Sequence, residues 1–345
     1  MAADQTSLSP EVTVWADARS AAGVMAVLDR MGSAVRPIGV GGPREPGVAS
    51  DAGVDRLAAT LDCARNDDLR KLLVDRPAAF LLLATMRDAS VADVQSAVRQ
   101  GMIVLALEPV VEELAELKTL NRADRSAGAG VGRILPVPAF DSSPGYLSAA
   151  EPGDAMGEAR TLHYESLGTS AEGSLYARLL DGWRTVLAFS SMPVTIDASL
   201  AAADDELVGR ARTASLRDMG GALTAHGRMD DGSSALLHIA DRSAETRRAL
   251  HVLGREGQLR VDDVSYSLRQ ITGELLDEAR PESGATFADL VAWQWRRLID
   301  RLDGVLPDPP SPGYENNALA CCLACLLSIR TGQPESPAKL AEIGR

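Results

Sequence analysis

The fold is decided by residues 12–21, Val-Thr-Val-Trp-Ala-Asp-Ala-Arg-Ser-Ala, an apolar run followed by a turn and the start of a helix. Dinucleotide-binding domains carry Gly-x-Gly-x-x-Gly here, because glycine allows a tight turn and close approach of the backbone to a diphosphate. The three glycine positions are Ala16, Ala18 and Ala21 in this chain. The methyl groups obstruct that approach, and Asp17 adds a carboxylate where a helix N-terminus would otherwise favour an anion. The stretch therefore predicts the strand, turn and helix of such a domain without its usual phosphate cradle.

The first 140 residues alternate short apolar runs with helical patterns, which is typical of a doubly wound parallel sheet. We assign residues 1–140 to a Rossmann-like α/β domain. The predicted strands are 12–15, 35–40, 78–85, 103–107 and 133–137, and the predicted helices are 21–30, 67–73, 91–100 and 110–121.

A stretch rich in Ser, Pro and Gly, residues 141–157, leads into a region whose apolar pattern has a period of two. Such a period is typical of antiparallel strands with one buried face. We therefore predict that residues 141–345 form an α+β domain with an open, mostly antiparallel sheet, in which 160–167 is an exposed edge strand. The other predicted strands are 193–198, 220–228, 234–240, 247–253, 258–263 and 264–269, and the predicted helices are 175–189, 287–303 and 314–331.

The composition is that of a globular protein, with 46% hydrophobic and 24% charged residues and a net charge of −13. An acidic chain poor in aromatic residues disfavours nucleic acid and anionic membranes as partners. We find no secretory signal and no apolar run of the roughly 20 residues needed to span a membrane, and we expect a cytoplasmic protein. The four cysteines are interpreted as structural thiols. We expect no metal site, because no two of the four histidines have the close spacing of a ligand pair; they are His163, His226, His238 and His251.

Three later phrases, in this order and spacing, resemble the Gfo/Idh/MocA family, named after glucose-fructose oxidoreductase, inositol 2-dehydrogenase and the rhizopine-catabolism protein. They are Gly-Ser-Ser-Ala-Leu-Leu-His-Ile (232–239), His-Val-Leu-Gly-Arg-Glu-Gly-Gln-Leu-Arg-Val (251–261), and residues 316–334 ending Ser-Ile-Arg-Thr-Gly-Gln-Pro. The resemblance implies an NAD(P)-dependent sugar or polyol oxidoreductase fold. It also implies a second-domain sheet that joins subunits.

The sequence departs from that family where its chemistry resides. The corner after the second strand, residues 39–42, reads Gly-Val-Gly-Gly and lacks the acidic residue that holds a ribose. In the phrase ending at Pro109, Glu108 stands at the position of the family's lysine, although a one-residue slip would instead align it with the motif's Glu and delete the lysine. In the motif Asp-x-x-x-His, Ala177 stands at the aspartate and Asp181 at the histidine.

The coordinated loss of these groups favours a non-catalytic homologue that acts by binding a protein or a ligand. We expect no cofactor, and a homo-oligomer or a hetero-oligomer with an active relative, formed through the second-domain sheet. The alternative is an NAD- or NADP-dependent oxidoreductase of a sugar or cyclitol with atypical catalytic residues. The candidates for a remaining ligand crevice are Arg19, Arg87, Glu108, Pro109 and Asp181.

Two of these candidates have structural alternatives. Glu108 is interpreted as a cap for a helix beginning at residue 110, in preference to a new acid or base. Asp181 is interpreted as an ion-pair partner of Arg178 or Arg184 on its own helix, in preference to a ligand for a cation.

Overall fold

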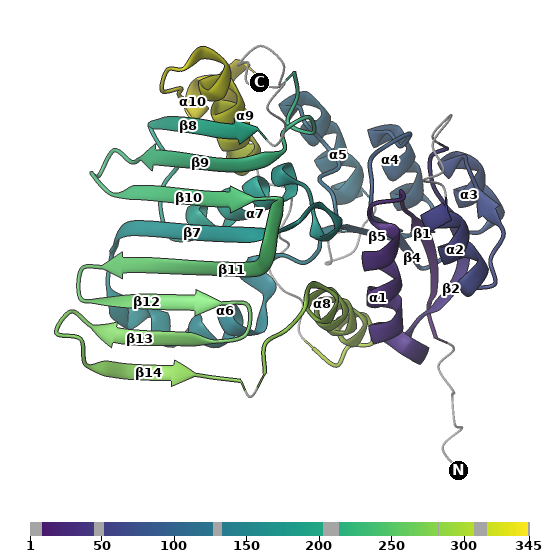
Figure 1. Cartoon of the computed structure of the whole chain (residues 1–345), viewed down its shortest axis with the longest axis horizontal. Helices are drawn as coiled ribbons and strands as arrows, with labels where there is room; N and C mark the ends of the chain where they lie inside the picture. Colours follow the sequence, from purple (N-terminus) through teal and green to yellow (C-terminus); the bar gives the residue numbers. More distant parts are fainter. Residues whose placement is uncertain are drawn as a thin grey trace. The chain divides into compact units, whose positions relative to one another are not determined.

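The computed structural model describes residues 9–44, 52–126, 133–202, 214–281, 283–306 and 316–343. The chain divides into two compact units (Figure 1). Unit 1 contains residues 1–110, 122–137 and 291–311, and unit 2 contains residues 111–121, 138–290 and 312–345. The proposed boundary at residue 140 stays a prediction. No described helix is both long and apolar enough to cross a membrane.

Unit 1 is built on a six-stranded parallel sheet with the order β3-β2-β1-β4-β5-β6. Its strands are β1 (Glu11–Trp15), β2 (Arg36–Gly41), β3 (Arg65–Asn66), β4 (Phe80–Leu83), β5 (Ile103–Ala106) and β6 (Ile134–Pro136). Strands β1, β4 and β5 are almost entirely buried because helices cover both of their faces. This is the strand order of a doubly wound dinucleotide-binding fold, so the predicted fold class is confirmed for this part of the chain.

The helices of unit 1 are α1 (Ala21–Met31), α2 (Ala52–Thr60), α3 (Leu69–Asp75), α4 (Val91–Arg99) and most of α8 (Phe287–Leu302). Helix α8 lies far along the sequence, yet its Trp295 is fully buried and packs edge-on against Phe80 of β4, with ring centroids 5.5 Å apart. Helix α5 (Leu114–Ser126) has residues in both units. It begins four residues later than predicted, so Glu108 does not precede its first turn.

Unit 2 contains an eight-stranded, mostly antiparallel sheet with the order β14-β13-β12-β11-β7-β10-β9-β8. Its strands are β7 (Ala159–Thr169), β8 (Thr195–Ala202), β9 (Gly221–Arg228), β10 (Ser234–Ala240), β11 (Arg242–Gly254), β12 (Gly257–Asp262), β13 (Tyr266–Gln270) and β14 (Leu275–Ala279). Its helices are α6 (Pro144–Ala149), α7 (Leu175–Leu187), α9 (Asn316–Thr331) and α10 (Pro337–Ile343). The open antiparallel sheet is confirmed.

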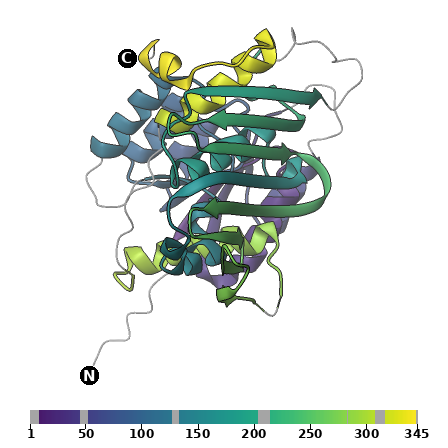
Figure 2. The same cartoon turned by 90° about the vertical axis from the view of Figure 1, so that its left-hand side faces the viewer.

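Alternation along the strands gives this sheet one buried and one accessible face. Helices α6, α7 and α9 pack on the inner face, where Leu162, Tyr164, Leu250 and Val252 are buried. In Figure 2 the strands lie in front of these helices, so the outer face is turned toward the viewer.

The position predicted for β7 is wrong. It was expected at an exposed edge, but it lies between β11 and β10, with residues such as Tyr164 fully buried. The polar residues between its buried positions indicate an open outer face, and they carry no information on lateral neighbours. Helix α2 and strands β3 and β14 were not predicted, because β3 has only two residues and β14 is exposed and acidic.

Candidate functional site

The edge of the unit 1 sheet at the carboxyl ends of β1 and β4 is the first candidate site. Strand order reverses between these two strands, and open α/β sheets bind ligands at such a switch point. Arg19 follows β1 and Arg87 follows β4, and both side chains are exposed. The indole Nε1 of Trp15 donates to the carbonyl oxygen of Arg87 at 3.2 Å, which joins the two strand ends.

The turn between β1 and α1 is closed by the carboxylate of Asp17. Its Oδ1 accepts hydrogen bonds from the Arg19 and Ser20 backbone N–H groups at 3.1 and 2.9 Å, and from the Ser20 hydroxyl at 2.9 Å. The Ser20 Oγ in turn accepts from the Asp17 N–H at 3.0 Å. Backbone N–H groups at this turn are those that bind a diphosphate in dinucleotide-binding folds. In this chain two of them already bind an anion of the protein itself.

The alanines of this turn adopt ordinary backbone conformations. Asp62 and Asp88 are the described non-glycine residues with positive φ, so Ala16, Ala18 and Ala21 need no glycine. The turn is also closely packed by α2: a Cβ built on Gly53 would lie 3.2 Å from the Ala18 carbonyl oxygen. The alanines therefore suit the turn as it is built.

The corner after β2 has no room for an acidic side chain. A Cβ on Gly42 would lie 2.0 Å from the Ala16 carbonyl oxygen, and one on Gly41 would lie 2.8 Å from Trp15 and from the Asn66 carbonyl oxygen. Glycine is required at both positions because backbones approach each other there. A ribose partner cannot be placed at either residue without moving the sheet.

Glu108 and Pro109 follow β5 in unit 1. Glu108 is half-buried and Pro109 is buried. Neither precedes the first turn of α5, which contains its own acceptor: Oε2 of Glu116 accepts from the Glu112 N–H at 3.3 Å. No further role for Glu108 or Pro109 follows from their placement.

Asp181, at the position of the family's histidine, lies on α7 inside a polar cluster of unit 2. Its Oδ1 accepts from the Phe140 N–H at 3.0 Å. Its Oδ2 accepts from the Tyr164 hydroxyl at 2.8 Å and from Nη1 of Arg248 at 3.2 Å. Ala177, one helical turn earlier, donates its N–H to Oγ of Ser174, which caps the helix. All three of the donors to Asp181 lie within unit 2, on elements other than α7.

The predicted ion pair of Asp181 within α7 is wrong. Arg178 donates instead to the Ser166 hydroxyl and to the Leu167 and Thr169 carbonyl oxygens, at 3.1–3.2 Å. Arg184 pairs with Asp141 at 2.9 Å. The partners of Arg178 therefore lie on β7, and the partner of Arg184 lies in the segment before α6.

Arg248 of β11 is the centre of the cluster. It makes bidentate contact with Asp263, with Nη2 2.6 Å from Oδ1, and Nη1 donates to the Pro138 carbonyl oxygen at 2.7 Å. Burial disfavours its charge, but the carboxylates of Asp263 and Asp181 outweigh burial and raise the pKa of Arg248. Burial and the Asp181 charge raise the pKa of Tyr164 well above its ordinary value. Arg248 is therefore charged and Tyr164 neutral across the physiological range.

The sequence contained a signal for this cluster that the motif comparison missed. Arg248 occupies the same strand face as Leu250 and Val252, which are buried. A buried arginine needs a carboxylate partner. That rule predicts an acidic neighbour for Arg248, although the pattern alone does not identify it as Asp181 or Asp263.

No family model matches the sequence, and a search of curated proteins finds no match. Solved structures do match. UDP-N-acetylglucosamine 3-dehydrogenase GnnA from Acidithiobacillus ferrooxidans is similar over 93% of this chain and 98% of its own, with a TM-score of 0.65 and 16% identity. The fold is that of the Gfo/Idh/MocA-type dehydrogenases. The resemblance drawn from the sequence is confirmed at this level.

Two further similar structures are complexes with a nicotinamide nucleotide. An oxidoreductase from Agrobacterium radiobacter, in complex with NAD+, L-tartaric acid and magnesium, covers 96% of this chain and 99% of its own at 12% identity and a TM-score of 0.67. Biliverdin reductase from Synechocystis, in complex with biliverdin and NADP+, covers 92% and 98% at 17% identity and a TM-score of 0.64. Their other ligands differ widely, so the fold does not identify a substrate.

The expectation of no cofactor is contradicted by these complexes. It was based on three missing glycines and a missing acidic residue, but this turn is well formed with alanine. Motif loss changes how a nucleotide would be held at the β1–β4 edge, and it does not remove the nucleotide-binding fold.

Proposed function

We propose that the protein binds a nicotinamide nucleotide at the β1–β4 edge of unit 1 and does not use Asp181 as the base for oxidising a sugar or polyol. It is then a binding protein with the fold of an oxidoreductase. The observation that supports the second part of the proposal is the triple hydrogen bonding of the Asp181 carboxylate by Phe140, Tyr164 and Arg248. No histidine is present on α7 to replace it.

Nucleotide binding is supported by the strand order and by the charge at the strand ends. Open α/β sheets bind ligands where the strand order reverses, as it does between β1 and β4, and the exposed Arg19 and Arg87 provide cations for a diphosphate. The NAD+ and NADP+ complexes of similar structures support the same ligand class.

Asp17 opposes this binding in a specific way. Its Oδ1 uses the N–H groups of Arg19 and Ser20, which a diphosphate oxygen needs. A carboxylate and a phosphate cannot share these donors, and they repel each other. A bound nucleotide must therefore displace the Asp17 side chain, and we expect affinity below that of a glycine-rich turn.

Titration of the full chain with NADH and NADPH, followed by nucleotide fluorescence and calorimetry, tests the proposal. We expect wild type to bind, and Asp17→Ala to bind at least about tenfold more tightly, because a hydrogen bond to a charged group contributes about 1.5–3 kcal/mol. Asp231→Ala is the matched control, since Asp231 in unit 2 also accepts local hydrogen bonds, from the N–H and hydroxyl of Ser233 at 2.8 and 2.6 Å. Its nucleotide affinity is expected to equal that of wild type.

Three results would overturn the proposal. Absent binding by both wild type and Asp17→Ala would remove the nucleotide site, and equal affinities would show that the nucleotide does not bind at the turn closed by Asp17. Turnover of a UDP-sugar, an inositol or another polyol by wild type, abolished in Asp181→Asn, would instead establish an oxidoreductase that uses Asp181.

A further inference from the structure

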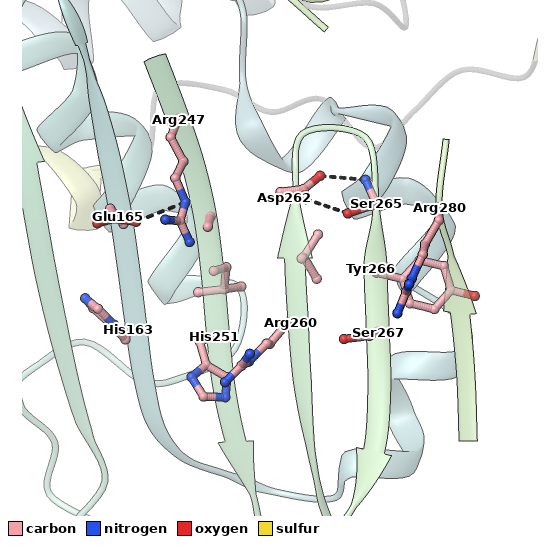
Figure 3. A pocket seen from close by; sticks show the side chains of 13 residues that line it. His163, Glu165, Arg247, His251, Arg260, Asp262, Ser265, Tyr266, Ser267 and Arg280 are labelled. Atoms are coloured by element: carbon pink, nitrogen blue, oxygen red, sulfur yellow. Dashed lines mark hydrogen bonds and ion pairs between the residues drawn. The ribbon is translucent and has the colours of Figure 1, made fainter. Parts of the chain in front are cut away.

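The outer face of the unit 2 sheet carries a row of basic side chains that extends across three strands. The strand registers place His163 of β7 opposite His251 of β11, His251 opposite Arg260 of β12, and Arg260 opposite Ser267 of β13. Directly opposite residues have Cβ atoms about 4.5–5.5 Å apart, and like charges in such pairs are destabilising. In Figure 3 the Arg260 guanidinium lies beside the His251 ring. Three groups that repel one another when charged are thus aligned across three strands.

These residues line a hollow of about 430 Å³. Ala249 lies in the adjacent row between Glu165 and Asp262, and its small side chain leaves space there. The hollow is lined by three arginines and two histidines but only two carboxylates, although the chain as a whole has a net charge of −13. Its size is in the range of sites for small molecules, about 300–1,000 Å³.

The carboxylates of the hollow are already bound to other groups. Glu165 forms an ion pair with Arg247, with Oε2 3.2 Å from Nε, and Nδ1 of His238 on β10 lies 3.8 Å from Oε1 of Glu165. Asp262 accepts from the N–H groups of Val264 and Ser265 and from the Ser265 hydroxyl, at 2.5–2.8 Å. Figure 3 shows both carboxylates turned toward these partners.

Arg260 and His251 lack anionic partners. Within the described part of the chain, Arg260 forms no ion pair, and Nε2 of His251 is buried with no hydrogen-bond partner. Arg280, the third arginine, pairs with Glu278 at 2.9 Å. Burial, Arg260 and His163 together lower the pKa of His251. An external anion between these groups would remove the repulsion that the row otherwise contains.

We propose that this hollow binds a phosphorylated small molecule, with the phosphate held by Arg260, His163 and His251. The planar guanidinium of Arg260 presents paired donors that match phosphate oxygens. Ser267, the next residue in the row, supplies a hydroxyl on the far side of Arg260. The remainder of the hollow accommodates the rest of the ligand, since its volume exceeds that of a phosphate group.

The site is sensitive to pH through His251. The charged or titratable groups that line the hollow around it are His163 and Glu165 on β7, Arg247 on β11, Arg260 and Asp262 on β12, Tyr266 on β13, and Arg280 after β14. On β10, Leu236 lies opposite His163 and His238 opposite Glu165. Bound anion stabilises the protonated imidazole of His251, so anion affinity rises as pH falls and the pKa of His251 rises on binding.

The test is an NMR titration of the histidine ring signals in the full chain with sulfate at pH 6 and pH 8, because sulfate keeps the same charge at both. We expect saturable shifts of His163 and His251, with sulfate bound at least about tenfold more tightly at pH 6. Inorganic phosphate and a hexose monophosphate are compared at pH 6, where the hexose monophosphate should bind more tightly. Sodium chloride at equal ionic strength should give no saturable shift.

Arg260→Gln should weaken sulfate binding by about tenfold or more, because it removes a charged partner of the anion. Arg228→Gln, on the same face at the end of β9, is the matched control and should change affinity by less than about twofold. Non-saturable shifts, or equal loss in both variants, would overturn the proposal. The expectation that this face joins copies of the chain stays a prediction: a changed sedimentation coefficient of Arg260→Gln without anion binding would assign the row to a subunit contact and also overturn it.

Discussion

Two aspartates that stand within family motifs, Asp17 and Asp181, are held in opposite ways. Asp17 binds groups two and three residues away along the chain, in a turn at the sheet edge. Asp181 binds groups 17, 41 and 67 residues away, within a cluster on the inner face of the unit 2 sheet. A ligand can displace the first carboxylate by local rotation. Displacement of the Asp181 carboxylate would break its hydrogen bonds to three other parts of the chain. These hydrogen bonds therefore contribute to the stability of unit 2.

The largest test of this difference is Arg248→Met, which removes the cation from the cluster. We expect a loss of about 3–5 kcal/mol in the free energy of unfolding, because two buried carboxylates lose their common partner. Urea denaturation followed by circular dichroism measures the loss.

Arg247→Met is the control for Arg248→Met, since the adjacent side chain points to the outer face. It pairs with Glu165 there and is more than half exposed, so we expect a change within about 1 kcal/mol. Equal losses in the two variants would contradict the structural role assigned to the Arg248 cluster.

The same substitution at both aspartates sharpens the comparison. Asp181→Asn should cost about 1–3 kcal/mol of unfolding free energy, because it removes a charge bonded to Arg248. Asp17→Asn should cost less than about 1 kcal/mol, since an amide oxygen can also accept from the turn. Parallel urea titrations give both values, and the ranking would be refuted by a larger loss at position 17.

The difference between Asp17 and Asp181 also explains how much of the site could be predicted from the sequence. The role of Asp17 was foreseeable because its partners lie in the same turn and follow local turn chemistry. The partners of Asp181 were not, because residues such as Arg248 become its neighbours only through the order of strands β7 and β11. Helical spacing predicted Arg178 or Arg184 as the ion-pair partner of Asp181, but tertiary packing gives both arginines other partners.

The fold was predicted better than the site for a related reason. The periods of apolar residues identified both sheets and most of their strands, since burial of one or two faces imposes those periods. They did not place β7 within its sheet, because alternation says nothing about lateral order. The expectation of no cofactor was wrong because the absence of the glycine pattern at residues 16–21 was taken to mean that no nucleotide binds.

The last prediction concerns the capping box at the start of α4, where residues close in sequence again hold a carboxylate. Oδ2 of Asp93 accepts from the Ser90 N–H and hydroxyl at 2.9 and 2.6 Å, and Nε of Arg70 lies 2.5 Å from its Oδ1. Burial raises the pKa of Asp93, but the hydrogen bonds from Ser90 and Arg70 outweigh burial and lower it. The folded state therefore favours the charged carboxylate.

Ser90→Ala should cost about 1 kcal/mol of unfolding free energy at neutral pH. A depressed folded pKa gives stability that is complete above the unfolded pKa of the carboxyl and is lost as pH falls through the lower folded value. The difference between wild type and Ser90→Ala should then shrink in urea titrations from pH 7 to pH 3. Ser96→Ala, within the same helix, should show no such pH dependence. A constant difference for Ser90→Ala would mean that local hydrogen bonds do not hold the Asp93 charge, and would weaken the same argument for Asp17.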